Sequence, residues 1–340
     1  MPSIEELRIL QALPLSLKVR RSQQRIREWV SHYGTEGVYI SFSGGKDSTV
    51  LLHLVRELYP SIPAVFVNTG LEYPEIQRFA RSFENVVTLR PEMAFPEVIK
   101  KYGYPLISKD IAQSISEARS GKEYALSKFD PDSAYCRKYP SWGLYKYRPL
   151  LTVPFPISAY CCDVMKKAPL KKYEKQEKRW PILGIMADES TIRFRSWERN
   201  GCNAFLSKRP KSRPLSFWTE NDILAYIKAE RLPICSVYGD VVVAGDDGFQ
   251  YDSVLGGPCK YKTTGCHRTG CIFCGFGAHL EKGEGRFERL KRTHPKQYDY
   301  CMGGGAYGED GIWRPSKQGL GMAHVIDELC RLYGPGFIKY

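Results

Sequence analysis

Apolar residues in the first two thirds of the chain follow two patterns, helical spacing and short continuous runs. Residues 5–33 have the spacing of an amphipathic helix, and a charged helix is predicted at about 165–178. A further helix is predicted after Thr219, a good N-cap residue. Short apolar runs typical of buried strands occur at 38–40, 63–68, 85–89 and 181–186. Strands that alternate with helices predict an α/β fold with a doubly wound, mostly parallel sheet, whose ligands bind at the carboxyl ends of the strands.

Two stretches lack this regular alternation. Residues 103–160 are rich in Tyr and Pro, and we expect them to form a long excursion near the active site. Beyond about residue 240 the periodic signal fades into a region rich in Gly, Cys and basic residues. The sequence therefore predicts an N-terminal helical segment (1–35), an α/β domain (36–240) and a Cys-rich C-terminal region (241–340).

The charge balance favours a polyanionic partner. The chain has 50 Lys and Arg residues against 37 acids, a formal net charge of +13, and its basic clusters include the segment 208–213. Such an excess suits nucleic acid, and a solvated basic surface around a nucleotide pocket is the alternative. No apolar run approaches the length of about 18 residues that a membrane span needs. The first residues carry two acids and no apolar signal region, so we expect a cytoplasmic protein with no membrane partner.

A Gly-rich turn with the sequence SGGKDS, residues 43–48, joins the first predicted strand to a helix. Glycines let the backbone approach an anion, successive N–H groups point at it, and the helix dipole favours its charge. Lys46 adds a cation, and Asp47 is a candidate ligand for Mg²⁺ on the phosphates. The spacing is not that of the Walker motif. The turn therefore predicts a phosphate site, and an ordinary Gly-Gly turn before a helix is the alternative.

Cysteine is frequent, with 11 residues in a chain that we expect to be cytoplasmic. This usage favours metal or redox chemistry over a disulfide framework. The candidates at ligand spacing are Cys161, Cys162, Cys259, Cys266, Cys271 and Cys274. Zinc and iron–sulfur ligation are both chemically possible, and the four cysteines from 259 to 274 could form a local zinc site.

The SGGKDS turn resembles the PP-loop of the ATP pyrophosphatases, which cleave ATP between the α- and β-phosphates and adenylate a substrate. Further segments, in order, resemble the phosphoadenosine phosphosulfate (PAPS) reductase family. They are Cys162-x3-Lys166 with Pro169-Leu170, the run 184–190 (GIMADES) with Arg193 and Arg195, and Pro214-Leu215-x2-Trp218-Thr219. The match runs discontinuously over about residues 36–240. It implies the adenine nucleotide α-hydrolase-like fold of the PP-loop enzymes.

The resemblance implies that ATP and Mg²⁺ bind at the PP-loop. The predicted nucleotide-binding residues are Ser43, Gly44, Gly45, Lys46, Asp47, Ser48, Asn68, Thr69 and Gly184. The predicted catalytic residues are Lys46, Asp47, Arg193 and Arg195. The cations among them would offset the charge that develops at the α-phosphate.

The resemblance also favours iron–sulfur over zinc. In the [4Fe–4S] adenylylsulfate reductases of this family, a Cys-Cys pair and a distant Cys-x2-Cys hold the cluster. The matching positions here are Cys161, Cys162, Cys271 and Cys274. One of them could be replaced by Cys301, with Cys259 and Cys266 as further alternates.

One family motif is missing from the sequence. Sulfonucleotide reductases carry a Glu-Cys-Gly-x-His segment whose cysteine attacks the sulfate sulfur, and no such segment occurs in these 340 residues. A PP-loop combined with a cluster also resembles the enzymes of tRNA thiolation and DNA phosphorothioation. We therefore expect an ATP-dependent sulfur-transfer enzyme that acts on nucleic acid, with a cysteine desulfurase or another sulfur donor as partner.

Two alternatives to this function stay open. One is a PAPS or adenylylsulfate reductase that has relocated its catalytic cysteine, for instance to Cys301. The other is a non-catalytic nucleotide-sensing module in which the cluster is a structural staple. The sequence also leaves open whether the protein is a homo-oligomer.

Overall fold

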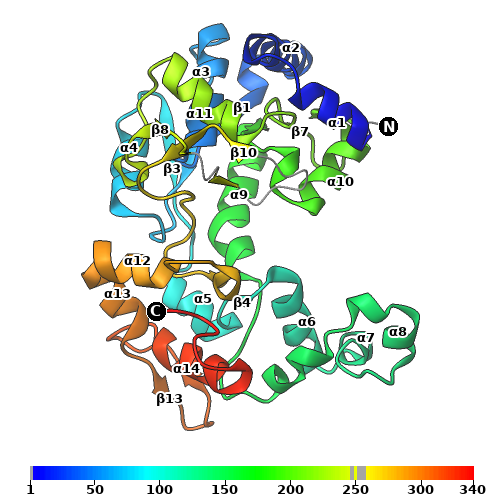
Figure 1. Ribbon diagram of the computed structural model, residues 1–340, viewed down its shortest axis with the longest axis vertical. Helices are drawn as coiled ribbons and strands as arrows, with labels where there is room; N and C mark the ends of the chain where they lie inside the picture. The colour runs from blue at the N-terminus through cyan, green and yellow to red at the C-terminus, as the bar shows by residue number, and fades with distance from the viewer. Residues whose placement is uncertain (1–2, 246–248, 251–257) are drawn as a thin grey trace. The chain divides into compact units, whose positions relative to one another are not determined.

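The computed structural model describes residues 3–245, 249–250 and 258–340, which group into two compact units (Figure 1). Unit 1 comprises Met1–Asn68, Glu72–Arg90 and Leu170–Thr269, and unit 2 comprises Thr69–Leu71, Pro91–Pro169 and Gly270–Tyr340. Each unit is thus assembled from segments that are far apart in the chain. The division along the sequence at residues 35 and 240 stays a prediction. In the part of the chain that is described, no helix is both long and apolar enough to cross a membrane.

Unit 1 is built on a sheet with the strand order β3-β2-β1-β5-β7-β6. The neighbouring strands are parallel, except that β6 is antiparallel to β7 at one edge. The strands of this sheet are β1 (Val38–Ser41), β2 (Ala64–Val67), β3 (Val86–Leu89), β5 (Trp180–Leu183), β6 (Asn203–Ala204) and β7 (Lys211–Ser212). The helices that accompany it are α1 (Ile4–Gln11), α2 (Leu15–Tyr33), α3 (Lys46–Leu58), α4 (Pro74–Arg81), α9 (Ala168–Glu177), α10 (Thr191–Asn200) and α11 (Glu220–Ala229).

Both faces of the central strand β1 are buried. Tyr39 packs edge-on against Tyr173 of α9, with ring centroids 5.3 Å apart. Its neighbours Val38 and Ile40 point to the opposite face, because side chains alternate along a strand, and both are fully buried there. Burial on both faces is typical of a parallel sheet covered by helices. The predicted α/β fold class, with a doubly wound and mostly parallel sheet, is confirmed.

The sheet has a topological switch point at the carboxyl ends of β1 and β5. The chain leaves β1 toward β2 on one side, whereas β5 pairs with β1 on the other side. Such a switch point is where open α/β sheets bind ligands. The Gly-rich turn 43–48 follows β1, and Gly184 follows β5.

Two predicted elements differ from those observed. The helix predicted over 5–33 is two helices, α1 and α2, which are separated at Pro14. Proline lacks the backbone donor that a continuous helix needs, and it disfavours helical geometry in the residue before it. The strand predicted over 181–186 ends at Leu183, so the following Gly184 belongs to the loop after β5 instead.

A buried polar network joins α2 to the segment that precedes α11. The Lys18 ammonium forms an ion pair with Asp222 at 2.6 Å, and their side chains are only 3% and 11% exposed. One turn away in α2, the Ser22 hydroxyl accepts a hydrogen bond from Trp218 Nε1 at 2.9 Å. These contacts fix the start of α11 against α2.

The start of α11 is also capped locally, as predicted. The Thr219 hydroxyl accepts a hydrogen bond from the Asp222 amide, and the Asp222 carboxylate accepts one from the Thr219 amide. This reciprocal arrangement is a capping box. It places the next residue, Glu220, at a defined position in the first turn of the helix.

The Lys18–Asp222 pair should contribute strongly to the stability of unit 1. We expect Lys18→Met to lower the free energy of unfolding by about 3 kcal/mol, because it leaves a buried carboxylate without its cation. Arg78→Gln is the matched control, since Arg78 pairs with Glu75 but is 71% exposed, and it should cost less than about 0.5 kcal/mol. Urea unfolding of both variants measures the difference. Equal losses would contradict this role for Lys18.

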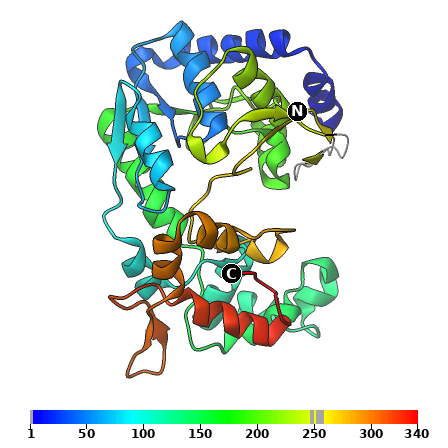
Figure 2. The ribbon, with the colours of Figure 1, turned by 60° about the vertical axis from the view of Figure 1, so that its left-hand side comes forward.

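Unit 2 contains mostly helices and short strand pairs (Figure 2). Its helices are α5 (Phe95–Tyr102), α6 (Lys109–Arg119), α7 (Glu123–Ser127), α8 (Ala134–Lys138), α12 (Arg286–Thr293), α13 (Pro295–Met302) and α14 (Met322–Tyr333). The strands β4 (Leu106–Ile107) and β12 (Gly275–Phe276) form a parallel pair. The strands β13 (Ala306–Tyr307) and β14 (Trp313–Arg314) form a hairpin that follows α13.

Candidate functional site

The Gly-rich turn forms a tight loop at the N-terminus of α3. Ser43 and Ser48 bridge the loop through their hydroxyls at 3.1 Å, and the Ser43 amide donates to the Ser48 hydroxyl at 3.2 Å. Gly44 has a φ of 71°, and a Cβ there would lie 3.0 Å from the Ile76 side chain. In the described part of the chain, no side chain caps α3. Its first turn therefore offers backbone donors and the positive end of the helix dipole to an anion.

Lys46 is held in a buried polar pocket beside this loop. Only 3% of its surface is exposed, and it forms an ion pair with Glu220, the residue that the α11 cap positions. Its ammonium also donates to the His267 carbonyl at 2.6 Å and lies 5.4 Å from the ring centroid of Tyr238. These contacts direct the lysine to one place at the start of α3.

Asp47 contributes a buried carboxylate to the same place. Burial raises its pKa, whereas the charges of Lys46, Arg268 and Arg193 act in the opposite direction. Its Oδ1 is buried and has no hydrogen-bond partner among the described residues. Burying a carboxylate oxygen without a partner is costly, so this atom fits the position of a ligand to a cation.

Glu220 is the second acidic group of the site. Burial raises its pKa, and the nearby Asp47 raises it further, whereas Lys46 lowers it. The two acids are surrounded by three cations, Lys46 together with Arg193 and Arg268. Cations gathered beside the start of α3 favour an anionic ligand such as a nucleotide triphosphate.

Of the two arginines predicted in α10, the structure brings only Arg193 to this cluster. The pKa of Arg193 is lowered by burial and by Arg268, while Asp47 raises it, and the side chain also pairs with Glu189. Arg195 is exposed and lies two residues further along the helix. Residues two apart are rotated by about 200° around a helix axis, so they face opposite directions.

Gly184 lies against the first turn of α3. A Cβ at this position would lie 3.0 Å from the Asp47 carbonyl oxygen and 3.4 Å from the Ser48 Cα. A larger residue would push the loop after β5 away from the backbone of Asp47 and Ser48. The position of Gly184 is therefore explained by packing, and its predicted contact with a nucleotide stays a prediction.

Asn68 and Thr69 follow β2. The Asn68 amide donates to the Leu89 carbonyl at 2.9 Å and so extends the pairing of β2 with β3. Thr69 is the first residue of unit 2, where its hydroxyl accepts a hydrogen bond from the Leu71 amide at 3.2 Å. Their predicted contacts with a nucleotide stay predictions.

The residues that sequence reasoning missed come from distant segments. Tyr238 follows α11, and its hydroxyl forms a hydrogen bond with Thr269. His267 and Arg268 belong to the Cys-rich stretch that we assigned to the C-terminal region, yet they lie in unit 1. Glu220 follows the predicted cap residue Thr219, and that adjacency is the one local signal that could have drawn attention to it.

Four of the predicted cysteine ligands gather in unit 2. Cys161 and Cys162 have their Sγ atoms 4.0 Å apart, and the charges of Cys271 and Cys274 act on Cys161. The turn from 271 to 274 is closed by a hydrogen bond from the Cys274 amide to the Cys271 carbonyl at 3.1 Å. The structure therefore brings the Cys-Cys pair and the Cys-x2-Cys turn together, and their role as ligands stays a prediction.

The surroundings of Cys162 favour a thiolate. Its pKa is lowered to about 6, chiefly by a hydrogen bond from Cys161, with Lys109 and Lys166 adding positive charge. The pKa of Cys161 is raised by the same hydrogen bond and by burial. Thiolates are the form in which cysteine binds metals, so two neighbouring lysines suit a cluster of thiolate ligands.

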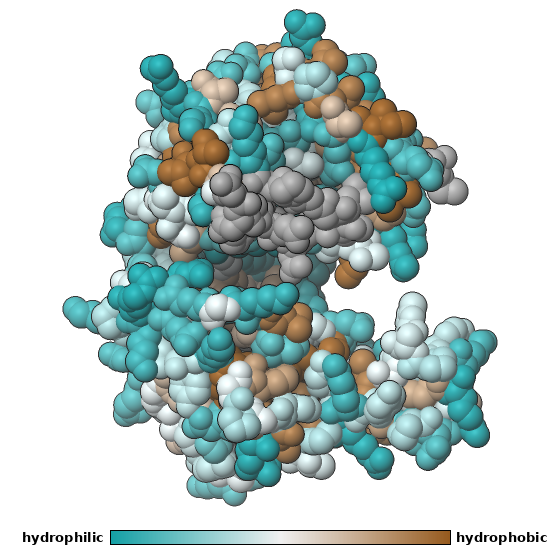
Figure 3. All heavy atoms as spheres, in the orientation of Figure 1, coloured by the Kyte–Doolittle hydropathy of each residue, from teal (hydrophilic) through white to brown (hydrophobic). Residues whose placement is uncertain are grey.

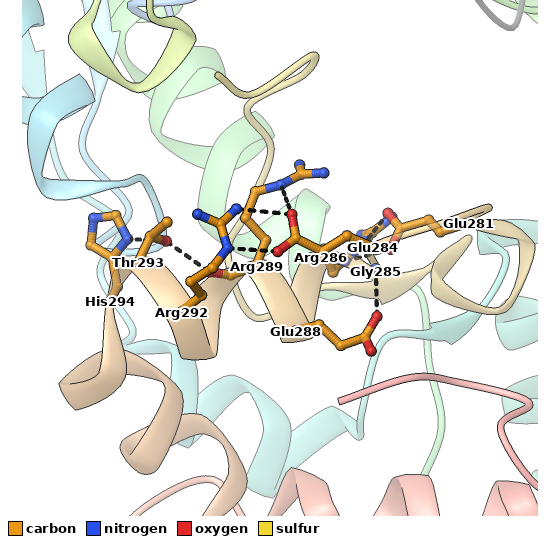
Figure 4. A network of polar contacts seen from close by, with 9 residues as sticks. All are labelled: Glu281, Glu284, Gly285, Arg286, Glu288, Arg289, Arg292, Thr293 and His294. Atoms are coloured by element: carbon orange, nitrogen blue, oxygen red, sulfur yellow. Dashed lines mark hydrogen bonds and ion pairs between the residues drawn. The ribbon is translucent and has the colours of Figure 1, made fainter. Parts of the chain in front are cut away.

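A network of polar contacts lies at the start of α12 (Figure 4), and one of its members, Arg286, reaches the turn from 271 to 274. Arg286 donates to the Cys274 carbonyl at 2.8 Å and forms an ion pair with Glu281 at 2.8 Å. Arg292 and Arg289 both pair with Glu284. Part of the basic charge in this segment thus serves internal contacts.

The other candidate cysteines lie elsewhere. Cys301 is completely buried in α13 beside Tyr104, and burial raises its pKa strongly. Cys266 belongs to unit 1, and strand β10 (Pro258–Cys259) ends at Cys259, whose side chain lies outside the described residues. Their roles as alternative ligands stay predictions.

Within the described ranges, no three His, Cys, Asp or Glu side chains converge so as to hold one metal ion. Zinc and iron–sulfur clusters both bind cysteine thiolates, so the four gathered thiols are candidate ligands for either.

The basic segment 208–213 is largely occupied by internal contacts. Arg213 is only 3% exposed and donates to the Ser196 hydroxyl and to the Gly201 carbonyl. Arg209 pairs with Glu174 at 2.6 Å. Of the four basic residues in this segment, all of which the structure describes, only Lys208 is exposed. The segment is therefore a weaker candidate for phosphate contacts than its sequence indicates.

Comparison with known proteins gave one family and several relatives. The sequence model described as "Phosphoadenosine phosphosulfate reductase domain" matches residues 37–110 and 141–274. The phosphoadenosine 5′-phosphosulfate reductase of Xanthomonas campestris pv. campestris (strain B100) is 31% identical over 234 residues, which cover 68% of this chain and 77% of the relative. The enzyme of the same name from Xylella fastidiosa (strain 9a5c) is 26% identical over 233 residues, covering 68% of this chain and 80% of the relative.

Solved structures resemble this chain weakly. The phosphoadenylyl-sulfate reductase of Candida auris has a TM-score of 0.37 and 14% identity, covering 69% of this chain and 91% of that one. The U34-tRNA thiolase NcsA of Methanococcus maripaludis, solved with its [4Fe-4S] cluster, has a TM-score of 0.34 and 16% identity, covering 64% of this chain and 66% of that one.

Proposed function

Because the chain belongs to the phosphoadenosine phosphosulfate reductase domain family, as its motifs indicated, we propose that it is an ATP pyrophosphatase that transfers sulfur to nucleic acid. The observation that carries the proposal is the loop 43–48 at the start of α3, with Lys46 and the Asp47 carboxylate buried beside it; among the described residues, no side chain caps α3 and none pairs with Asp47 Oδ1. A pre-formed loop with backbone donors and a lysine suits the phosphates of ATP.

In the proposed reaction, an acceptor oxygen attacks the α-phosphorus of ATP. The bond between the α-phosphorus and the bridging oxygen breaks, and pyrophosphate leaves. Lys46 and Arg193 offset the negative charge that develops on the phosphates. Asp47 would hold Mg²⁺ through its Oδ1, and that ion would supply further charge compensation.

Sulfur then replaces the activated oxygen. A donor such as a cysteine desulfurase, together with a thiol reductant, supplies sulfur at the oxidation level of sulfide. The sulfur forms a bond to the acceptor atom, the bond from that atom to the adenylated oxygen breaks, and AMP leaves with the oxygen. The acceptor is a nucleic acid, either a tRNA base or the DNA backbone, and the net charge of +13 supports this choice.

Cys161, Cys162, Cys271 and Cys274 would hold a [4Fe–4S] cluster in this scheme. When bound, the cluster would supply iron–sulfur chemistry, and an iron open to sulfur would require that one of the four thiolates is released. The hydrogen bond from Cys161, with Lys109 and Lys166 adding positive charge, lowers the pKa of Cys162 and so favours its thiolate, and Arg286 donates to the Cys274 carbonyl. The donor set and its two lysines support this assignment.

A sulfonucleotide reductase is the second candidate function, because the similar bacterial proteins are named phosphoadenosine 5′-phosphosulfate reductases. Anaerobic incubation with ATP, a sulfur donor and either tRNA or DNA separates the two. We expect equal amounts of pyrophosphate and AMP, together with sulfur in the nucleic acid. Sulfite formed from PAPS or adenylylsulfate with a thiol donor, without cleavage of ATP, would favour the reductase.

Glu220 should limit the affinity of the site for phosphates, because its charge lies beside Asp47 and Lys46. We expect Glu220→Gln to bind ATP roughly tenfold more tightly, which corresponds to about 1.4 kcal/mol. Glu36→Gln is the control, since the Glu36 side chain is 86% exposed in its pair with Arg179. Titration calorimetry measures both affinities. Unchanged or weaker binding by Glu220→Gln would show that its carboxylate does not compete with the phosphates.

A further inference from the structure

Exposed aromatic side chains cover α7, α8 and the turn after them in unit 2. Tyr124 is 64% exposed, Trp142 63%, Tyr145 53% and Tyr139 43%. Successive ring centroids are 5.5 Å apart from Tyr124 to Tyr135, 5.5 Å from Tyr135 to Tyr139 and 6.2 Å from Tyr139 to Trp142. We call these five residues the aromatic surface.

The backbone beneath the aromatic surface is held by buried contacts. Phe129 is 2% exposed, and the Leu144 amide donates to the Lys128 carbonyl at 2.7 Å. A Cβ on Gly143 would lie 3.0 Å from the Tyr145 ring, so glycine lets this ring lie against the backbone. Side chains that are positioned before binding lose less entropy when a ligand arrives.

Basic side chains accompany the rings. Lys128 lies 5.0 Å from the ring centroid of Tyr124, and Lys138 lies 5.4 Å from that of Tyr139. Residues 122–148 contain six basic residues, Lys122, Lys128, Arg137, Lys138, Lys146 and Arg148, and three acids, Glu123, Asp130 and Asp132. In Figure 3 the lobe that holds α7 and α8, at the lower right, shows mainly hydrophilic and intermediate residues. Lys122 pairs with Glu117, and Asp110 acts on Tyr135, so the cations that lie next to the rings are Lys128 and Lys138.

Most of this surface lies outside the residues that the family model matches. The family match covers 37–110 and 141–274, so it omits residues 111–140, where α7, α8 and Tyr124, Tyr135 and Tyr139 lie. Trp142 and Tyr145 follow within a few residues of the resumed match. The aromatic surface is thus mainly a feature of this chain beyond the matched domain.

We propose that the aromatic surface binds a single-stranded stretch of nucleic acid. Bases stack on exposed aromatic rings regardless of sequence, and neighbouring lysines and arginines neutralise the phosphates. Protein–protein interfaces also use Tyr and Trp, but their cores are depleted in Lys, whereas here lysines lie next to the rings. The proposal rests on the proposed function, since it names the part of the chain that would hold the acceptor.

The test measures binding of fluorescent single-stranded RNA and DNA of one sequence, and of the matching duplex, to the full chain without ATP. We expect the single strands to bind more tightly than the duplex. Trp142→Ala with Tyr145→Ala should weaken single-strand binding at least tenfold, because stacking on each ring contributes strongly. Tyr307→Ala is the matched control, since Tyr307 is an exposed aromatic residue of unit 2 in β13, at 54% exposure. It should leave the affinity unchanged.

The salt dependence separates the rings from the cations. Lys138→Ala with Lys146→Ala should make the log–log salt slope shallower by about 1.4, at roughly 0.7 for each phosphate contact to a single strand. The double aromatic variant should keep the parent slope, because rings neutralise no phosphate.

The outcomes of these measurements distinguish a failure of the surface proposal from a failure of the proposed function. If the parent protein binds single strands and the aromatic variant binds them equally well, the assignment of this surface is overturned while the proposed function stands. If the variant instead loses binding to the cysteine desulfurase, the surface is a protein-docking site and the proposal fails. If the parent thiolates nucleic acid but shows no preference for single strands, the surface proposal alone is wrong. If it neither binds nor thiolates nucleic acid, the proposed function fails too.

Discussion

A Cys274→Ser variant purified without oxygen should be colourless and contain almost no iron, whereas the parent protein should be brown with about four irons for each chain. The Cys274 thiol lies near Cys162, and burial raises its pKa. Serine at this position cannot supply a thiolate to the cluster. Quantification of iron and acid-labile sulfide measures the loss directly.

A second cysteine controls for a general effect of losing a thiol. Cys330 lies in α14, where its Sγ donates to the Ile338 carbonyl at 3.7 Å, and it is not one of the four gathered cysteines. We expect Cys330→Ser to keep the colour and the iron. ATP cleavage without acceptor turnover by Cys274→Ser would show that unit 1 still folds. A colourless parent protein holding one zinc, or a Cys274→Ser protein that keeps its full iron, would refute the cluster assignment.

The sequence was sufficient for the parts of the fold that local patterns determine. The strands β1, β2 and β3 match short runs of β-branched and apolar residues, and they lie where we predicted them. The Gly-rich turn after β1 was recognisable because its glycines, lysine and aspartate are contiguous. The cap at Thr219 was predictable for the same reason, since a capping box depends on residues three apart.

The candidate site could be predicted only in part, because most partners of Lys46 come from distant segments. Glu220 comes from α11, and the His267 carbonyl comes from the loop that ends unit 1 at Thr269. No local sequence pattern encodes the packing that brings them to Lys46. The choice between Arg193 and Arg195 depended on helix phase, which became definite only when the start of α10 at Thr191 was known.

The helices in residues 103–160 and in the C-terminal region were also missed by the sequence analysis. Residues 103–160 include three helices, α6, α7 and α8, and the last third of the chain includes α12, α13 and α14. α7 and α8 have five residues each, and α12 and α13 have eight, which is too short for a helical period to emerge from aromatic and basic residues. α14 is longer, with 12 residues, but it follows a Gly-rich stretch that obscured its start.

The sequence also could not show which basic side chains face solvent and which are used in internal contacts. From sequence alone, the basic segment 208–213 stood out as a nucleic-acid contact, but buried Arg213 supports the end of α10 through the Gly201 carbonyl. A count of lysines and arginines does not distinguish a cation that binds a backbone carbonyl from one that faces solvent. The half-buried Lys128 and the exposed Lys138 are less concentrated in sequence, yet they lie beside exposed rings.

The Asp47→Asn variant should lose pyrophosphate release while gaining stability. Asparagine keeps the size of the side chain but cannot supply an anionic oxygen to Mg²⁺, so we expect the rate of pyrophosphate release to fall by at least two orders of magnitude. Asp240→Asn is the control, because Asp240 lies in an exposed loop of unit 1, and it should release pyrophosphate at the parent rate.

The gain in stability follows from the direction of the pKa shift. Burial raises the pKa of Asp47 in the folded protein, so ionisation favours the unfolded chain at every pH above the ordinary pKa of an aspartate. Asparagine removes this penalty, and we expect Asp47→Asn to be more stable by about 1 kcal/mol at neutral pH without nucleotide. The difference should vanish as the pH falls below the ordinary pKa, because both forms are then neutral. A group retained despite such a cost is typical of a functional site. Pyrophosphate release at the parent rate, or a loss of stability at neutral pH, would show that Asp47 has a structural role instead.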